Sequence, residues 1–195
     1  MTNTNTSATG GPLISTNVIQ LDDIALANIL STLYANLLNI DVNTLVFPRW
    51  QHEPPSIPDS NTTWISHGIV ARRADINSSE QFINGTGTII ERNQELDSLI
   101  SIYGPNMGNF EQRLRSGLSI SQNRDYITQY GIVLVEVQKA RNVSELINNF
   151  WQPKLDLVII FRRRLIDIYP ILPLLKLPIN VITESNYTND SVINL

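Results

Sequence analysis

The clearest pattern of apolar and polar positions lies between Leu21 and Leu38. Apolar residues recur there at intervals of three and four, which is the spacing of one face of an α-helix. They are Leu26, Ile29, Leu30, Leu33, Leu37 and Leu38. Asp22 and Asp23 stand at the start of the pattern, where negative charge is favourable beside the positive end of the helix dipole. The pattern therefore predicts a helix over residues 21–38.

Alternating and β-branched segments predict strands further along the chain. In the segment 64–75, Trp64, Ser66 and Gly68 fall on one face and the residues between them on the other. The segment 85–104 contains two strand-like runs, which a polar stretch at 92–95 separates. The predicted strands cover 45–47, 64–75, the two runs within 85–104, 132–138 as a buried strand, 151–169 as one long strand, and a short terminal strand near 179–183.

Two shorter segments have helical spacing. Phe110, Leu114 and Leu118 share one helical face and predict a helix over 110–118, and a second helix is predicted over 124–130, ended by Gly131. The order of helix, strands, helices and strands predicts an α+β fold, with an antiparallel or mixed sheet and helices packed on one face.

Residues 47–63 form a proline-rich segment between the first helix and the long strand that follows. Pro54, Pro55 and Pro58 lack backbone donors and fix their own φ angles, and each favours an extended conformation in the residue before it. The segment is therefore predicted to be a stiff, extended arm. Trp50, which lies in this segment next to the proline run, has two open interpretations, an aromatic tucked against its own chain or one that docks on a neighbouring molecule.

Length and charge narrow the class of protein. The chain has 195 residues, and 42% of them are apolar, which is enough for one domain with a core. We expect a flexible N-terminal tail over 1–20, a single domain over 21–175 that includes the arm, and a C-terminal extension over 176–195. The net charge of −4 disfavours a protein that grips nucleic acid by its phosphates. We expect no signal peptide, because residues 1–16 have neither a basic nor an apolar region, and no membrane association, because no apolar run reaches the roughly 18 residues of a membrane span.

The sequence offers no arrangement of residues that suggests catalysis. There is no cysteine, and His52 and His67 are not spaced as metal ligands, so a surface or packing role is expected for each. The stretch Gly85-Thr86-Gly87 lacks the third glycine of a dinucleotide-binding fingerprint and suggests a turn or a bulge. We therefore expect no enzyme activity, no metal site and no cofactor.

The run Arg162-Arg163-Arg164 is the sharpest cluster of charge. It is consistent with a phosphate or DNA contact, or with pairing to carboxylates within or between subunits, and the negative net charge favours pairing. In a strand, Arg162 and Arg164 share one face and Arg163 has the other. Because Arg163 follows Leu157, Ile159 and Phe161 on an apparently buried face, it is expected to need a carboxylate or carbonyl partner.

Polar residues near the second short helix raise a related question. Ser121 and Asn123 are both candidates for its N-cap, which would place Arg124 in an exposed first turn. A positive charge is unfavourable there, so Arg124 is expected either to meet a carboxylate on an adjacent subunit or simply to be solvated. For Glu91, Glu95 and Asp97 the expected role is a solvated face or a subunit contact.

Several longer stretches, in the same order, resemble phage neck terminator proteins. They are "PRWQHEPPSIPDSNTTWISHGIVARRAD" (48–75), "ELDSLISIYGPN" (95–106), "LRSGLSISQNRDYI" (114–127) and "FWQPKLDLVIIFRRRLIDIYPIL" (150–172). The similarity extends from about Leu45 to Leu172 and is absent from both tails. Because separate motifs match in order, the resemblance is more specific than any single short pattern.

The resemblance implies a structural protein of tailed-phage virions, assembled in the host cytoplasm. Such a protein forms a homo-oligomeric ring, expected to have six subunits, that ends the tail tube or sheath. Its expected partners are copies of itself, head-completion or connector proteins above, and tail tube and sheath proteins below. DNA is expected to pass through the channel without sequence-specific binding.

Candidate contact residues combine the arm, the short helix and the arginine run. They are Arg49, Trp50, Gln51, Glu53, Pro54, Pro55, Asn123, Arg124, Arg162 and Arg164. The alternative function is a nucleic-acid-binding module that uses Arg162–Arg164. An enzyme of unknown type is a third hypothesis with no residues behind it.

Overall fold

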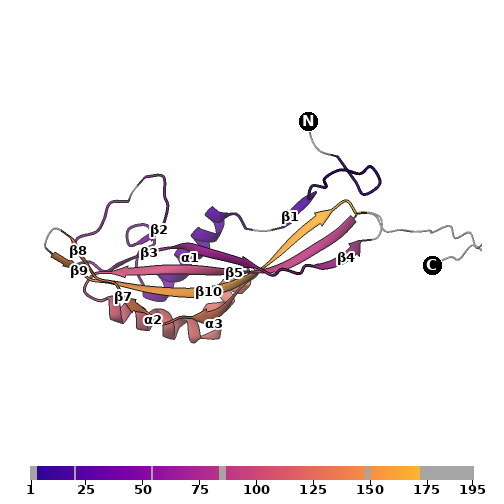
Figure 1. Ribbon diagram of the computed structural model, residues 1–195. Helices are drawn as coiled ribbons and strands as arrows, with labels where there is room; N and C mark the ends of the chain where they lie inside the picture. The colour runs from indigo at the N-terminus through magenta and orange to yellow at the C-terminus, as the bar shows by residue number, and fades with distance from the viewer. Residues whose placement is uncertain (1–3, 20, 54, 84–86, 148–149, 172–195) are drawn as a thin grey trace, which may run out of the picture. The chain divides into compact units, whose positions relative to one another are not determined.

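The computed structural model describes residues 4–19, 21–53, 55–83, 87–147 and 150–171 (Figure 1). By its internal contacts the chain divides into two compact units. The larger unit contains residues 19–78 and 91–166, and the smaller unit contains 1–18, 79–90 and 167–195. The predicted boundaries of the tails and the single domain stay predictions.

The predicted first helix is confirmed as α1 (Asp23–Leu38). It begins at Asp22, whose carboxylate accepts a hydrogen bond from the Ala25 amide at 2.6 Å and so caps the first turn. It ends at Asn39, which has a left-handed backbone with φ of 55°. Asparagine tolerates this conformation better than most residues, which explains why the helix stops there.

Within the described residues, the strands form a mixed sheet of eight and a separate antiparallel pair. The main path of the sheet is β1-β10-β5-β3-β2, with β4 beside β5 and both β6 and β7 beside β10. Strand β2 is parallel to β3, whereas β3 is antiparallel to β5 and β6 is antiparallel to β10. The strands of the sheet are β1 (Asn17–Ile19), β2 (Val46–Pro48), β3 (Trp64–Ala74), β4 (Ser79–Ile83), β5 (Gly87–Tyr103), β6 (Ile132–Val137), β7 (Arg141–Asn142) and β10 (Lys154–Tyr169). The separate pair is β8 (Glu145–Ile147) with β9 (Phe150–Gln152).

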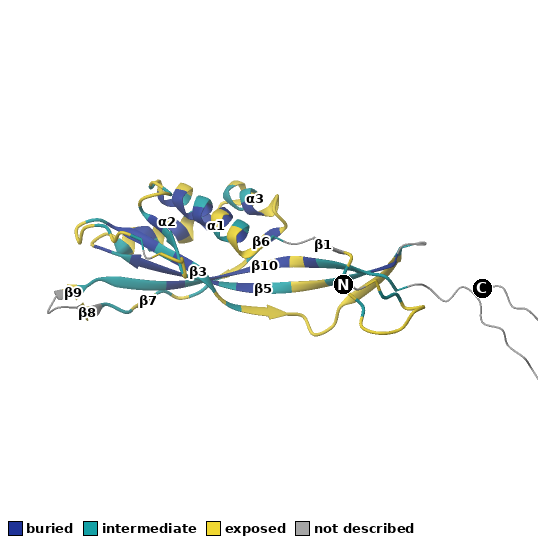
Figure 2. Cartoon of the chain, turned by 90° about the horizontal axis from the view of Figure 1, so that it is seen from above, coloured by how far each residue is buried: buried dark blue, intermediate teal, exposed yellow. Residues whose placement is uncertain are grey.

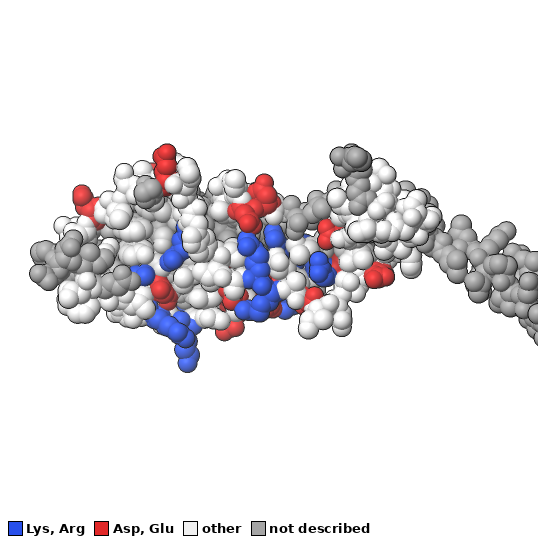
Figure 3. All heavy atoms as spheres, turned by 45° about the horizontal axis from the view of Figure 1, so that its top comes forward, with Lys and Arg blue, Asp and Glu red and all other residues white. Residues whose placement is uncertain are grey.

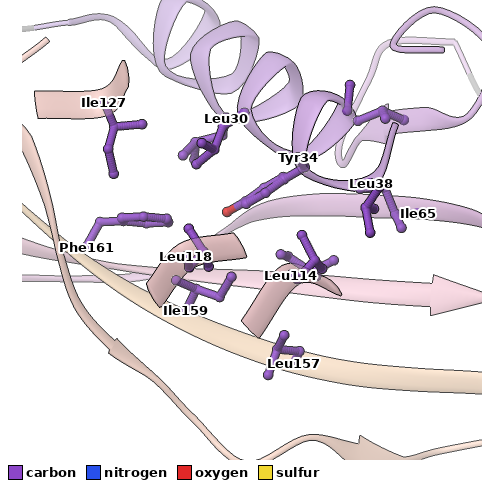
Figure 4. Packing of buried hydrophobic residues seen from close by; sticks show 14 of the residues in the cluster. Leu30, Tyr34, Leu38, Ile65, Leu114, Leu118, Ile127, Leu157, Ile159 and Phe161 are labelled. Carbon is purple, nitrogen blue, oxygen red and sulfur yellow. The ribbon is translucent and has the colours of Figure 1, made fainter. Parts of the chain in front are cut away.

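Two further helices, α2 (Met107–Ser119) and α3 (Ser121–Thr128), complete the α+β fold that the sequence predicts. Figure 2 shows α1, α2 and α3 on the same side of the strands in the larger unit. The core lies between this helical layer and the sheet, and Figure 4 shows its contributors from both layers. Residues fully or almost fully withdrawn from solvent include Leu30, Tyr34, Ile65, Ile100, Leu114, Leu118, Ile127, Leu157, Ile159 and Phe161.

A β-bulge changes the alternation of β3 part-way along its length. Ile69 pairs with Ser98 and Ala71 pairs with Asp97, so Val70 is an extra residue without a partner position on β5. Beyond the bulge, Arg72 points to the helical side and forms an ion pair with Asp23 at 2.7 Å. Arg73 consequently points to the opposite face of the sheet.

Two predicted strand boundaries were wrong. Residues 87–103 form one continuous strand, β5, where the sequence suggested two runs separated at 92–95. Of those polar residues, Gln94 pairs with Arg163 of β10, and Glu95 pairs with Arg73 of β3 and Arg162 of β10, so the stretch continues the strand. Residues 151–169 form two strands, β9 and β10, which are separated at Pro153. Proline lacks the amide donor that a continuous ladder needs.

Two other local predictions need correction. Strand β6 is an edge strand in which only Ile132 is buried, while Val133 and Val135 are exposed, so the prediction of a buried strand was wrong. Helix α3 begins at Ser121, three residues earlier than predicted. The terminal strand predicted near 179–183 lies outside the described residues.

In the smaller unit, backbone hydrogen bonds join the N-terminal segment to the end of β10 and the residue that follows it. The Thr16 amide donates to the Ile168 carbonyl at 2.7 Å, and the Ser7 amide donates to the Pro170 carbonyl at 3.1 Å. Gly87 begins β5 with φ of 145°, and a side chain there would collide with the Tyr169 carbonyl oxygen. The preceding Gly85 and Thr86 lie outside the described residues.

Candidate functional site

Arg49, near the start of the predicted arm, is fixed to the chain's own sheet. Its amide donates to the His67 carbonyl at 2.7 Å, which extends the contact between β2 and β3. Its guanidinium donates to Ser101 Oγ on β5, and that hydroxyl donates to Asp156 Oδ1 on β10. Arg49 therefore joins the edge of the sheet to its central strands through a chain of polar contacts.

Trp50 follows directly and holds its indole outward. Its φ is 60°, a conformation that is uncommon for a bulky residue and costs about 1–3 kcal/mol. The ring lies over Gly68, because a Cβ added to that glycine would be only 2.7 Å from Cζ3 of Trp50. Even so, 71% of the Trp50 surface is exposed. The fold thus fixes the backbone of the preceding residue, Arg49, and seats one edge of the Trp50 ring on Gly68, while most of the apolar surface of Trp50 stays in contact with solvent.

A pocket of about 590 Å³ lies between the start of α1, residues 48–52 and β3. Its lining combines apolar groups such as Ile24, Leu30 and Trp50 with the polar groups of Arg49 and His67. Ile24 is 75% exposed, so two large apolar side chains, Ile24 and Trp50, line a hollow with most of their surface free. This pocket therefore places exposed apolar side chains beside two polar groups that the fold holds in place.

His67 has the predicted packing role and lines the pocket on its buried side. It is fully buried, its Nε2 is 2.8 Å from Ser31 Oγ, and its ring packs edge-on against Tyr34. Burial, assisted by the positive charge of Arg49, lowers the pKa of His67 to about 4. The imidazole is accordingly neutral at pH 7. Among the described residues no group of three potential metal ligands occurs.

The other residues of the predicted arm have fewer contacts. Gln51, His52 and Glu53 are exposed, and Pro55 lines a second, smaller pocket beside β2. Pro54 lies outside the described residues. The extended shape of the arm stays a prediction, as does its assignment to a subunit contact.

The corner between α2 and α3 has a different construction from the one predicted. Neither Ser121 nor Asn123 caps α3, because no side chain accepts a hydrogen bond at its N-cap, Ile120. The side chains of Asn123 and Arg124 instead donate hydrogen bonds to carbonyls at the end of α2. Asn123 donates to the Gly117 carbonyl at 2.9 Å, and Arg124 donates to the Leu118 and Ser119 carbonyls at 2.9 and 2.6 Å. Arg124 therefore satisfies carbonyls that the helix end leaves free.

This arrangement predicts the effect of reversing the charge at Arg124. Arg124→Glu removes the cation from the negative end of α2 and leaves two carbonyls without their donor. We expect the free energy of unfolding to fall by about 1–2 kcal/mol, measured by urea denaturation. Arg124→Lys, which keeps the charge, serves as the control and should lose less. Unchanged stability of Arg124→Glu would show that the corner contributes nothing to folding.

The arginine run and the carboxylates of β5 meet on the sheet face opposite the helices. Arg162 pairs with Glu95 at 2.6 Å, and Arg164 pairs with Glu91. Arg73 pairs with Asp97 at 2.8 Å and with Glu95 at 3.4 Å. We call these six residues the charge ladder. Figure 3 shows a column of basic side chains in the middle of the face in view, with acidic side chains at its upper end and around it.

The predicted alternation within the run is confirmed. Arg163 is buried on the helical side, where its Nε donates to Gln94 Oε1 and its Nη1 donates to the Leu21 carbonyl, both at 2.9 Å. It thus has the carbonyl partner that burial requires. Sequence reasoning missed Arg73 as a member of the charge ladder, because the bulge at Val70 reverses the alternation that precedes it.

Comparison with known families decides the identity. A family model described as phage neck terminator protein matches residues 25–190. The chain belongs to the phage neck terminator protein family. No curated protein sequence matches the chain. The family match confirms the resemblance drawn from the sequence motifs, but it also covers residues 25–44 and 173–190, so the predicted limits of 45–172 were too narrow. Membership makes the protein a structural component of the bacteriophage neck without enzymatic activity.

The neck terminator fold contains three helices within the described residues, and none of them has the length and apolar character needed to span a membrane. The sites that we predicted from the sequence fall in three separate places in this terminator: the pocket at Trp50, the corner at Arg124, and the charge ladder.

Proposed function

We propose that this neck terminator assembles with copies of itself into a ring, expected to have six subunits, that ends the tail and joins it to the head connector. The ring leaves a channel through which DNA passes. Its other partners are connector proteins on the head side and the tail tube on the other, with the sheath added if the tail is contractile. Membership of the family supports the location of the protein, and the exposed, fixed indole of Trp50 carries the proposal of a ring contact.

A ring requires contacts in which one patch of a subunit meets a different patch on the next. Trp50 suits such a contact for two reasons. It presents a large apolar surface beside a pocket, which is the usual character of an interface residue that contributes strongly to binding. Arg49, the residue before it, is anchored to the sheet and Gly68 seats its ring, so docking costs less conformational entropy than it would for an unanchored side chain.

The alternative function, a nucleic-acid-binding module based on Arg162–Arg164, has less support. Each of these arginines has a partner within the chain. A guanidinium that already donates to a carboxylate has fewer donors to offer a phosphate. Purified protein is therefore expected to bind duplex DNA weakly, and the dependence of that binding on salt should be shallow.

Truncation of Trp50 tests the ring contact. We expect Trp50→Ala to change the melting temperature of the isolated subunit little, because most of the side chain is exposed, but to reduce incorporation into neck-deficient particles strongly. The measurements are thermal unfolding and a complementation assay for infectious particles. Trp50→Gly tests the same contact without the strain of a side chain at φ 60°.

Trp64→Ala provides the matched control, because Trp64 is buried and stacks on Tyr103 with ring centroids 4.1 Å apart. This variant should lower the melting temperature by several degrees. If Trp50→Ala destabilised the subunit as much as Trp64→Ala, Trp50 would belong to the core and the proposed contact would fail. Purified virions that lacked the protein, or rings absent from images of the neck, would contradict the assembly itself.

A further inference from the structure

The charge ladder contains equal numbers of opposite charges. Three arginines, one on β3 and two on β10, face three carboxylates on β5, the strand between them. Their formal charges sum to zero at pH 7. The carboxylates occur at Glu91, Glu95 and Asp97, which are odd-numbered positions of one strand and therefore share a face.

The two kinds of charge differ in their access to solvent. The side chains of Arg73, Arg162 and Arg164 are 53%, 47% and 57% exposed. Those of Glu91, Glu95 and Asp97 are only 22%, 27% and 15% exposed. The guanidinium groups therefore form the outer layer, and an anion that approaches this face meets the arginines first.

The ion pairs of the charge ladder shift the pKa values of Glu95 and Arg73. The pKa of Glu95 is lowered, chiefly by its hydrogen bond from Arg162, and the pKa of Arg73 is raised, chiefly by its hydrogen bonds to Asp97. Both shifts favour the charged forms, so the pairs persist at neutral pH. A carboxylate offers an arginine the same oxygen acceptors as a phosphate does, which makes the two anions direct competitors for the guanidinium donors.

We propose that the charge ladder is a masked phosphate-binding surface whose partner is duplex DNA, and that the β5 carboxylates keep its contact with DNA weak. The proposal rests on the proposed function, in which DNA passes through the ring. A ring multiplies every phosphate contact of one subunit by the number of subunits, so three unmasked arginines per subunit would hold the duplex strongly. With the carboxylates in place, each subunit contributes a polar surface without net charge.

The test unmasks Arg162 and Arg164 by removing the charge of their partners with little change in shape. The variant is Glu91→Gln/Glu95→Gln, and the probe is a short duplex DNA titrated with purified protein at several salt concentrations. We expect binding about tenfold tighter than that of the wild type at about 50 mM salt, because each gained phosphate contact contributes about 0.9 to the slope of log K against log salt. The slope should consequently steepen by about 2.

Two companion variants identify the cause. Asp125→Asn/Glu136→Gln removes the same amount of negative charge from exposed carboxylates that form no ion pair within the described residues, and it should bind DNA like the wild type. Adding Arg162→Ala/Arg164→Ala to the unmasked variant should remove the gain. If the unmasked variant does not fold, the single variants Glu91→Gln and Glu95→Gln should each show about half of the change in slope.

The result that overturns the proposal is an unmasked variant with the affinity and slope of the wild type. A gain of equal size in Asp125→Asn/Glu136→Gln, or a gain that survives loss of both arginines, also overturns it. The assay uses free protein and free DNA, so it does not depend on ring formation. Absence of rings in images of the neck would refute the proposed assembly. The DNA titration would still test the charge ladder independently.

Discussion

Phe161→Ala is expected to lower the free energy of unfolding by about 3–5 kcal/mol. Phe161 is fully buried on β10, on the sheet side of the core that Figure 4 shows, opposite side chains of all three helices. Truncation removes the apolar contacts of the ring and leaves a cavity that the rigid sheet is poorly able to fill. The measurement is urea denaturation of the purified protein, with the midpoint and the slope fitted together.

Phe82→Ala is the matched control, because Phe82 on β4 is more than half exposed. Its loss should change stability by less than about 0.5 kcal/mol. Phe161→Leu keeps most of the volume and should fall between the two, so it preserves the test if the alanine variant does not fold. Equal stabilities of Phe161→Ala and the wild type would contradict the assignment of this residue to the core.

His67 is expected to make the protein less stable as the pH falls from about 6.5 to about 4. Its pKa is about 4 in the folded protein against an ordinary value of 6.5, so in this range the unfolded chain binds a proton that the folded chain does not. Stability therefore rises with pH between the two values and is independent of His67 outside them. The full effect is on the order of 3 kcal/mol, since one pKa unit corresponds to about 1.4 kcal/mol.

The experiment compares the unfolding free energies of the wild type and His67→Gln across this range. Glutamine retains a polar partner for Ser31 but does not titrate, so the pH dependence should become flatter. Taking the difference between the two proteins removes the contribution of carboxylates such as Glu95, whose pKa is also lowered. An unaltered slope in His67→Gln would show that His67 is not the group responsible.

Periodicity was a reliable guide where one face of an element meets the core. Helix α1 and strand β3 lie within a few residues of their predicted bounds, because burial imposes regular spacing on Leu26, Leu30, Ile65 and His67. It failed where side chains from other strands compensate for local polarity. The polar stretch at 92–95 looks like a break in the sequence, yet Gln94 and Glu95 bind arginines of β10 and β3 and so remain within β5.

The candidate site was predictable in composition but not in arrangement. Trp50 and the arginine run stand out in the sequence, and the alternation of Arg162, Arg163 and Arg164 follows from strand geometry. The partners of these residues did not follow, because they come from elements far apart in the chain, as Arg164 and Glu91 do. Arg124 shows the same limit, since the carbonyls it binds belong to the preceding helix and no local preference indicates them.

The extra residue at Val70 reverses the alternation of β3, so that the positions facing the helices differ before and after it. Before it, odd-numbered residues face the helices, and after it, even-numbered residues do. The neighbouring residues Arg72 and Arg73 therefore lie on opposite faces of the sheet. Arg72 pairs with Asp23 on the helical side, and Arg73 pairs with Asp97 on the other. Deletion of Val70 is therefore not a small change, because it would turn Arg72 and Arg73 to the opposite faces of the sheet. An insertion in the loop after Ala74 lacks that effect, so tolerance to length changes differs sharply between neighbouring positions of this chain.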